Sequence, residues 1–192
     1  MKELIDSGRI GEVHFVNLKL HLPPNRADFD KNNLPWRVLP EIAGAGYFYD
    51  LASHQLNFLD YYFGDIIDAS GYTANFAQLY EVEDAIQACF KFKCGVIGTG
   101  SWSFVVDENM KADSVEIIGE NGKIEFSSFE KEPILVKTKS GVEKIEMQWP
   151  AHVHEPLVRT VVDELLGRGK CVSKADSGVR TNWAMDKILD RL

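Results

Sequence analysis

The stretch from Gly44 to Gly64 constrains the fold of this chain more than any other. Its apolar residues recur almost all the way round a helical projection, so the sequence predicts one helix, between the two glycines, that is largely buried. A few polar residues nevertheless follow the spacing i, i+4, i+7 and i+11, which places them in one seam along one face of the helix. Because a buried helix should not carry polar groups without reason, this seam is the candidate active site. Its members are Asp50, His54, Asn57 and Tyr61.

Most of the remaining chain is predicted to form strands. Alternating apolar residues or β-branched and aromatic enrichment mark them, and Asn121-Gly122 is the best hairpin signal. The predicted strands are 12–22, 66–78, 84–93, 96–106, 114–118, 123–127, 134–139 and 142–148, and the predicted outer helices are 2–7, 154–166 and 177–192.

Length and strand order together predict the fold class. A chain of 192 residues suits a single domain, here residues 1–192, and no internal repeat or low-complexity linker divides it. Hairpins make neighbouring strands antiparallel, and the strand at 84–93 alternates apolar with semi-polar residues. We therefore expect an α+β fold, an open and mainly antiparallel β-sheet with helices packed on one face.

The segment 23–40 is rich in Pro, Asn and Asp and cannot be regular, and loops of this size are often functional. Within it, Trp36 and Arg37 can stack on and hydrogen-bond a polyol, or serve equally as a loop anchor and a surface ion-pair partner. His21 ends the preceding strand on its polar face and should point toward the loop. It is a substrate-binding candidate whose competing interpretation is a solvated histidine.

Charge and hydropathy exclude several classes of function. The net charge of −8 argues against a nucleic-acid or anionic-membrane surface, no apolar run is long enough to cross a bilayer, and the N-terminus lacks the apolar core of a secretory signal. Cys89, Cys94 and Cys171 lack metal-type spacing and are expected to be reduced thiols. We therefore expect a cytoplasmic protein without nucleic-acid or membrane partners.

Two glycine pairs invite a nucleotide-binding interpretation, and both fail it. Gly44-Ala45-Gly46 follows a proline-containing loop rather than a strand, and Gly98-Thr99-Gly100 has Ser103 at the third position and is followed by a strand. The sequence therefore assigns no cofactor-binding residue. It assigns no metal ligand either, although a metal-dependent hydrolase or isomerase built on the seam with His152 and His154 remains a weaker alternative.

Asp50 and His54 lie one helical turn apart, so both side chains can address the same point. A carboxylate beside an imidazole can orient it as a general base or acid. The competing interpretation is a pair that satisfies itself inside a core, retained for structure alone.

The order of motifs between residues 36 and 64 resembles the Gfo/Idh/MocA family, the group of glucose-fructose oxidoreductase and inositol dehydrogenase. The matching residues are Trp36-Arg37, Gly44-Ala45-Gly46, Asp50-x-x-x-His54, Asn57 and Gly64, and residues 4–13 are similar to the family's entry into its C-terminal domain. The resemblance implies a two-domain enzyme whose N-terminal Rossmann domain binds NAD or NADP. That half and its Glu-Lys-Pro lysine are absent here, so the chain is expected to be an excised or truncated C-terminal domain with no cofactor bound.

The same resemblance implies roles for the candidate residues. His54 would take the hydroxyl proton of a sugar or cyclitol, Asp50 would orient His54 or bind a substrate hydroxyl, and Asn57 would lie near the substrate. The chain alone is expected to have no turnover. The alternative is a noncatalytic oligomerisation module in which Asp50 and His54 form a structural pair.

An open sheet with helices on one side leaves a second face, through which we expect a homodimer or tetramer. The aromatic residues of the strands make it improbable that so few helices cover all of the apolar strand surface. These residues are Phe90, Phe92, Trp102 and Phe104.

Overall fold

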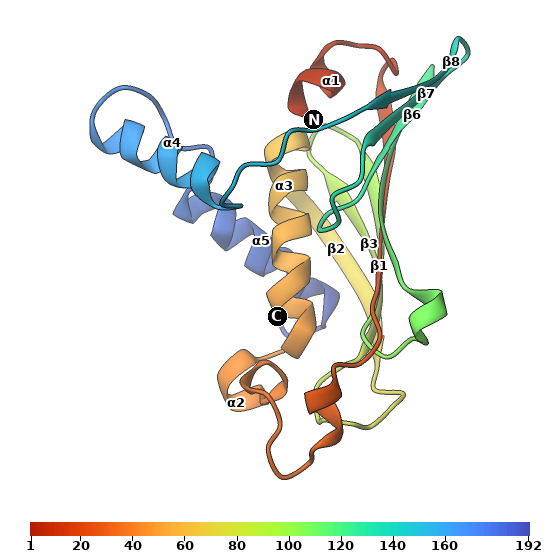
Figure 1. Ribbon diagram of the computed structural model, residues 1–192, viewed down its shortest axis with the longest axis vertical. Coiled ribbons are helices and arrows are strands. Elements are labelled where there is room, and N and C mark those ends of the chain that lie inside the picture. Colours follow the sequence, from red (N-terminus) through yellow and green to blue (C-terminus); the bar gives the residue numbers. More distant parts are fainter.

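The computed structural model describes residues 1–192 and is built on one eight-stranded sheet (Figure 1). The strand order is β2-β3-β4-β1-β5-β6-β7-β8, and the β1–β4 pair is parallel while every other pair is antiparallel. The expectation of an open, mainly antiparallel sheet is confirmed. The strands are β1 Val13–His21, β2 Ile66–Ala74, β3 Ala85–Phe92, β4 Ile97–Ser103, β5 Ala112–Gly119, β6 Gly122–Phe126, β7 Ile134–Thr138 and β8 Gly141–Ile145.

Helices lie on one side of this sheet, as Figure 1 shows. α3 and α5 pack against each other, and α5 also contacts β2 and β3. None of the helices combines the length and the apolar character needed to cross a membrane. The helices are α1 Lys2–Asp6, α2 Pro40–Ala43, α3 Ser53–Phe63, α4 Glu155–Leu165 and α5 Ala175–Ile188.

Side-chain alternation along the strands separates a covered face from an open one. In β1, Val16, Leu18 and Leu20 are buried, while the residues between them point to the opposite face. The strand carries a register irregularity between Val13 and Phe15 against β5. This alternation is what the sequence pattern predicts for a sheet covered on one side.

The aromatic residues expected to leave apolar surface on the open face lie instead on the covered face. Phe90, Phe92, Trp102 and Phe104 are each at most 3% exposed, so that expectation is wrong. Two glycines of β4 make room for the rings: a Cβ added at Gly98 or at Gly100 would fall 2.0 Å from the ring of Phe90 or Trp102. The Gly-x-Gly of β4 is therefore a packing feature.

The segment predicted as one helix from Gly44 to Gly64 begins later than expected. Gly44 and Gly46 have φ values of 63° and 61°, in the left-handed region, so they form the turn that follows α2. A π-helical turn, Phe48–Ala52, then leads directly into α3. Such turns are rare and occur frequently at functional sites, and this one contains Asp50.

The loop predicted to be irregular contains short helical turns. They are the 3₁₀ turns Arg26–Phe29 and Trp36–Val38, followed by α2. Single turns of this kind leave no periodic apolar pattern, and Pro35 and Pro40 precede or begin the later ones. The sequence therefore predicts the loop but not its internal turns.

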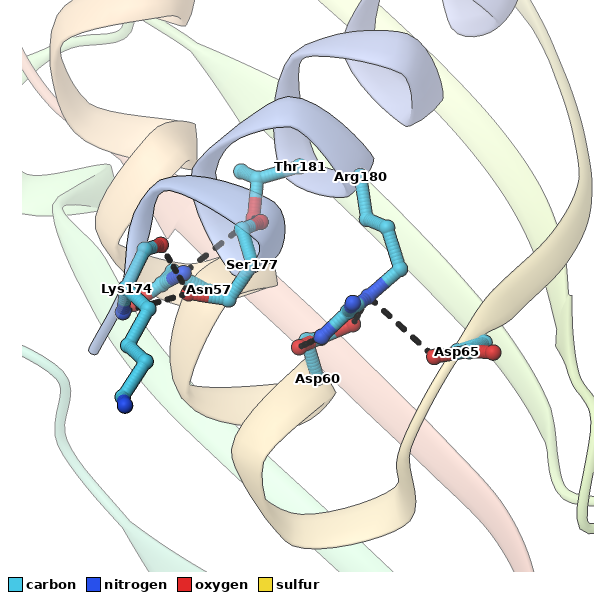
Figure 2. Close-up of polar contacts among 7 residues, drawn as sticks. All are labelled: Asn57, Asp60, Asp65, Lys174, Ser177, Arg180 and Thr181. Atoms are coloured by element: carbon cyan, nitrogen blue, oxygen red, sulfur yellow. Dashed lines mark hydrogen bonds and ion pairs between the residues drawn. The ribbon is translucent and has the colours of Figure 1, made fainter. Parts of the chain in front are cut away.

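A polar cluster joins α3 to α5 (Figure 2). Arg180 donates from Nε and from an Nη atom to the two carboxylate oxygens of Asp60, at 2.8 and 2.7 Å, and its Nε lies 3.2 Å from Asp65. One turn earlier on α3, Asn57 donates to the Thr181 hydroxyl at 3.3 Å. The cluster anchors α5 on the covered side of the molecule.

α4 extends away from the sheet and has no buried residue (Figure 1). The helix predicted at 154–166 from its apolar spacing is confirmed. The resulting stripe remains exposed and consists of Leu157, Val158, Val161, Val162, Leu165 and Leu166.

Candidate active site

A cleft of about 580 Å³ lies beside the π-helical turn that precedes α3. Three segments form its walls: the loop that follows β1, the π-helical turn with the residue before it, and the connection between β4 and β5. The cleft is lined by Leu22, Pro23, Asn25, Ala27, Pro35, Arg37, Tyr47, Asp50, Leu51, Phe104, Glu108 and Lys111. It brings the predicted residues Arg37 and Asp50 together.

Arg37 holds Asp50 in this cleft. Its Nε donates to Asp50 Oδ2 at 2.8 Å, and its guanidinium lies 4.6 Å from the ring centroid of Trp36. Both side chains of the ion pair are partly exposed, so the remaining guanidinium donors and carboxylate lone pairs stay accessible. Arg37 is thus an ion-pair partner, which is one of the two interpretations that its sequence context allows, and Trp36 remains 51% exposed.

A buried carboxylate links two walls of the cleft through Tyr47 and Asn25. Asp28 is fully buried and accepts hydrogen bonds from the Tyr47 hydroxyl and the Asn25 backbone N–H, each at 2.8 Å. The Asn25 side-chain amide donates to the same hydroxyl at 2.8 Å. Burial, reinforced by Asp28, raises the pKa of Tyr47 to about 12, so Tyr47 stays protonated and keeps donating.

His54 is exposed and is not hydrogen-bonded to Asp50. Its ring meets Phe129 edge-on, with 6.1 Å between centroids. His54 does not line the cleft; it follows the cleft-lining Asp50 by four residues along the helix and packs on Phe129. Cleft-lining Lys111 pairs with Glu130, the neighbour of Phe129, at 2.8 Å. Because His54 is exposed and Asp50 is partly exposed and paired with Arg37, the structure gives no support to a self-satisfied pair inside a core.

The neighbouring Gln55 fixes the loop that carries Phe129. Gln55 is fully buried, accepts from Trp102 Nε1 at 2.7 Å and donates to the Ser128 hydroxyl at 2.7 Å. This bridge ties α3 both to the centre of the sheet and to the loop against which His54 packs.

The other predicted site residues lie elsewhere. Asn57 is turned toward α5 by its bond to Thr181, and Tyr61 is exposed. His21 does not point toward the 23–40 loop: it lies on the open face and bonds the Ser101 hydroxyl at 2.7 Å. Partial burial, together with Lys19, lowers the pKa of His21. The four polar residues of the seam therefore do not share one site: Asp50 lines the cleft, Asn57 contacts α5 and Tyr61 is exposed.

Sequence reasoning missed several residues of the cleft. Lys111 precedes β5 without any motif, and nothing in its neighbours marks it. Asn25 and Asp28 do carry a signal, since an Asn followed three residues later by Asp is a capping pattern of the kind the structure shows there. Tyr47 lies within the stretch that the sequence predicts as one helix and carries no separate signal.

No segment of this chain forms a dinucleotide-binding unit. The parallel neighbours β1 and β4 are joined by a long connection that includes α2, α3 and two antiparallel strands, and neither glycine pair follows a strand and opens a helix. In the cleft, no three His, Cys, Asp or Glu side chains converge as metal ligands, and His152 and His154 belong to no such group. A metal-dependent hydrolase at Asp50 and His54 therefore lacks support.

Comparison with known proteins identifies the fold and the family. Residues 1–125 match the GFO/IDH/MocA C-terminal domain. Oxidoreductase P35 of Formosa agariphila is 30% identical over 186 residues, which cover 97% of this chain and 56% of that protein. The chain thus spans little more than half the length of this curated relative.

Solved structures share the fold at low sequence identity. Aldose-aldose oxidoreductase from Caulobacter crescentus, complexed with glycerol, superposes with a TM-score of 0.83 at 17% identity, over 99% of this chain and 57% of that chain. Levoglucosan dehydrogenase, in complex with NADH and levoglucosan, gives a TM-score of 0.83 at 17% identity, over 99% and 59%. With the family match over residues 1–125 and the shared fold in agreement, the chain belongs to the GFO/IDH/MocA family of oxidoreductases and represents the C-terminal domain of such an enzyme.

Proposed function

We propose that this chain is the substrate-binding and catalytic-residue domain of an NAD(P)-dependent oxidoreductase that acts on a sugar or cyclitol hydroxyl. The observation that carries the proposal is the cleft in which Arg37 holds Asp50, with an exposed imidazole, His54, four residues further along the same helix. Family membership supports it, as do the levoglucosan and glycerol named for the structural relatives.

Oxidation of an alcohol requires a base near the hydroxyl oxygen of the substrate. Oxidation of a secondary alcohol removes a proton from oxygen and a hydride from carbon, and His54 accepts the proton. Asp50, fixed by Arg37, accepts a hydrogen bond from a neighbouring hydroxyl, and the exposed part of Trp36 packs against the apolar face of the ring. Asn57 and His21 are not included, because their contacts direct them to α5 and to the open face.

The hydride acceptor is a nicotinamide cofactor, NAD or NADP, bound by residues outside 1–192. Hydride chemistry belongs to that group, and this chain's residues bind the polyol, orient it and accept its proton. The alternative of a noncatalytic module is less well supported, because it explains neither the cleft nor the accessible imidazole.

Turnover assays test the proposal. We expect purified residues 1–192 to show no NAD- or NADP-dependent oxidation of any sugar or cyclitol, and the same residues joined to a nucleotide-binding domain of this family to oxidise at least one. Cofactor reduction followed by absorbance measures both. Turnover by residues 1–192 alone, or a joined enzyme that is folded, binds cofactor and is inactive on every polyol, would contradict the proposal.

We further propose that the open sheet face forms a homodimer or tetramer. Phe15 and Ile97 are register neighbours in β1 and β4 and are 48% and 46% exposed, which gives this face an apolar centre. We expect Phe15→Glu with Ile97→Lys to convert the oligomer to a monomer in light-scattering chromatography. Leu165→Lys on the exposed stripe of α4 is the matched control. A monomeric unmodified chain, or an oligomer lost only in the control, would contradict this interface.

We place the protein in the cytoplasm. Cys89 and Cys94 are free and exposed, and Cys171 is free and buried, which suits a reducing compartment.

A further inference from the structure

Three potential metal ligands meet at the end of the sheet remote from the cleft. Glu12 immediately precedes β1, His14 is the second residue of that strand, and Glu120 lies in the turn between β5 and β6. One ligand atom from each of the three side chains lies within 4.8 Å of the others. β1 leads from this cluster to the cleft-lining Leu22, which separates His14 from Leu22 by about 25 Å at strand rise.

The backbone beneath the cluster is held in place. Glu120 N–H donates to the carbonyl of Glu12 at 3.0 Å, and Asn121 N–H donates to the carbonyl of Ile10 at 2.8 Å. Gly119 approaches this segment so closely that a Cβ there would lie 2.3 Å from the Ile10 carbonyl oxygen. The three ligands therefore sit on two segments that are already docked together, and only side-chain rotamers need to adjust.

The charges of this cluster are not compensated within the chain. None of the three side chains has a hydrogen-bond or ion-pair partner, although two are carboxylates close to each other. Elsewhere on the same sheet, the facing carboxylates Glu116 and Glu125 are paired with Lys123, and Glu125 is paired also with Lys137. A bound cation would neutralise Glu12 and Glu120 as these lysines neutralise Glu116 and Glu125.

We propose that Glu12, His14 and Glu120 bind one divalent transition-metal ion of the Zn²⁺ type. An imidazole with two carboxylates suits Zn²⁺ and Ni²⁺, whereas Mg²⁺ and Ca²⁺ prefer oxygen ligands alone. Three protein ligands leave a coordination position for water. The bound ion would form a brace, that is, a cross-link at the surface between the β5–β6 turn and the start of β1. The brace is separate from the active-site cleft and does not depend on the proposed oxidoreductase function.

Titration calorimetry of residues 1–192 with ZnCl₂, NiCl₂ and MgCl₂ tests the site. We expect one Zn²⁺ or Ni²⁺ per chain, no comparable Mg²⁺ binding, and a rise in the unfolding temperature with Zn²⁺. His14→Ala and Glu120→Gln should each weaken Zn²⁺ binding about tenfold or more and reduce the thermal shift. His154→Ala, which removes another exposed histidine, is the matched control and should change neither.

Three results would overturn the proposal. They are the absence of saturable Zn²⁺ and Ni²⁺ binding up to millimolar concentration, binding that survives His14→Ala, and binding that is lost in His154→Ala. Because His14 and Glu120 are exposed, their substitution should leave the metal-free unfolding temperature unchanged. That measurement separates loss of a ligand from loss of the fold.

Discussion

Replacing His54 with alanine in the complete oxidoreductase should lower kcat for polyol oxidation by about 10²- to 10⁴-fold, the usual contribution of a positioned general base. The loss should appear in kcat, since the proton is transferred in the transition state while ground-state binding rests on Asp50, Arg37 and Trp36. His54 is exposed and its ring packs edge-on against Phe129, so the unfolding temperature should not change.

Two further variants of the complete oxidoreductase serve as comparisons for His54→Ala. Tyr61→Phe alters an exposed residue of the same helix and should leave kcat within about twofold of the unmodified enzyme. Arg37→Lys retains the charge but not the geometry of the guanidinium that holds Asp50, so it should raise KM. Unchanged kcat in His54→Ala would exclude His54 as the base. Loss of folding in the same variant would instead indicate a structural residue.

Arg180→Met should destabilise the domain by about 2–4 kcal/mol. Removing one partner of a buried ion pair typically costs about 3–5 kcal/mol, and the range is lowered here because the Arg180 side chain is 37% exposed whereas that of Asp60 is 4% exposed. The variant leaves the Asp60 carboxylate in a desolvated position without its bidentate partner. Chemical denaturation measures the effect as a lower midpoint.

Arg159→Met provides the control for this prediction. Arg159 forms an exposed i,i+4 pair with Glu155 on α4, so its removal should change the free energy of unfolding by no more than about 0.5 kcal/mol. Replacing Asp60 and Arg180 together by leucine should recover most of the lost stability, because no buried charge is then left unpaired and Asp65, the other partner of Arg180, is solvated. Equal effects of Arg180→Met and Arg159→Met would show that the Asp60 pair does not anchor α5.

The strands were predictable because alternation is a local property. Val16, Leu18 and Leu20 already mark the covered side of β1 in the sequence, and the structure places them there. The face of the sheet that the larger aromatic rings occupy was not predictable in the same way. Gly98 and Gly100 admit the rings of Phe90 and Trp102 on the covered side, and such packing depends on the pairing of β3 with β4.

The candidate site was predictable in part. Asp50 stood out because it is polar within an apolar helix, and the structure places it in a cleft. Its partner could not be read from helical spacing, because Arg37 reaches it from a loop whose 3₁₀ turns leave no periodic signal. Asn57 looked equivalent to Asp50 in the sequence, yet its surroundings are set by α5, which is more than a hundred residues away in the chain.

The most direct measurement is a crystal structure of the complete oxidoreductase with a polyol substrate and reduced cofactor. The account predicts that the reacting hydroxyl lies within hydrogen-bonding distance, about 3 Å, of an imidazole nitrogen of His54, with a second hydroxyl on Asp50. A polyol bound on the open sheet face, or anywhere that leaves both side chains without a ligand contact, would contradict it.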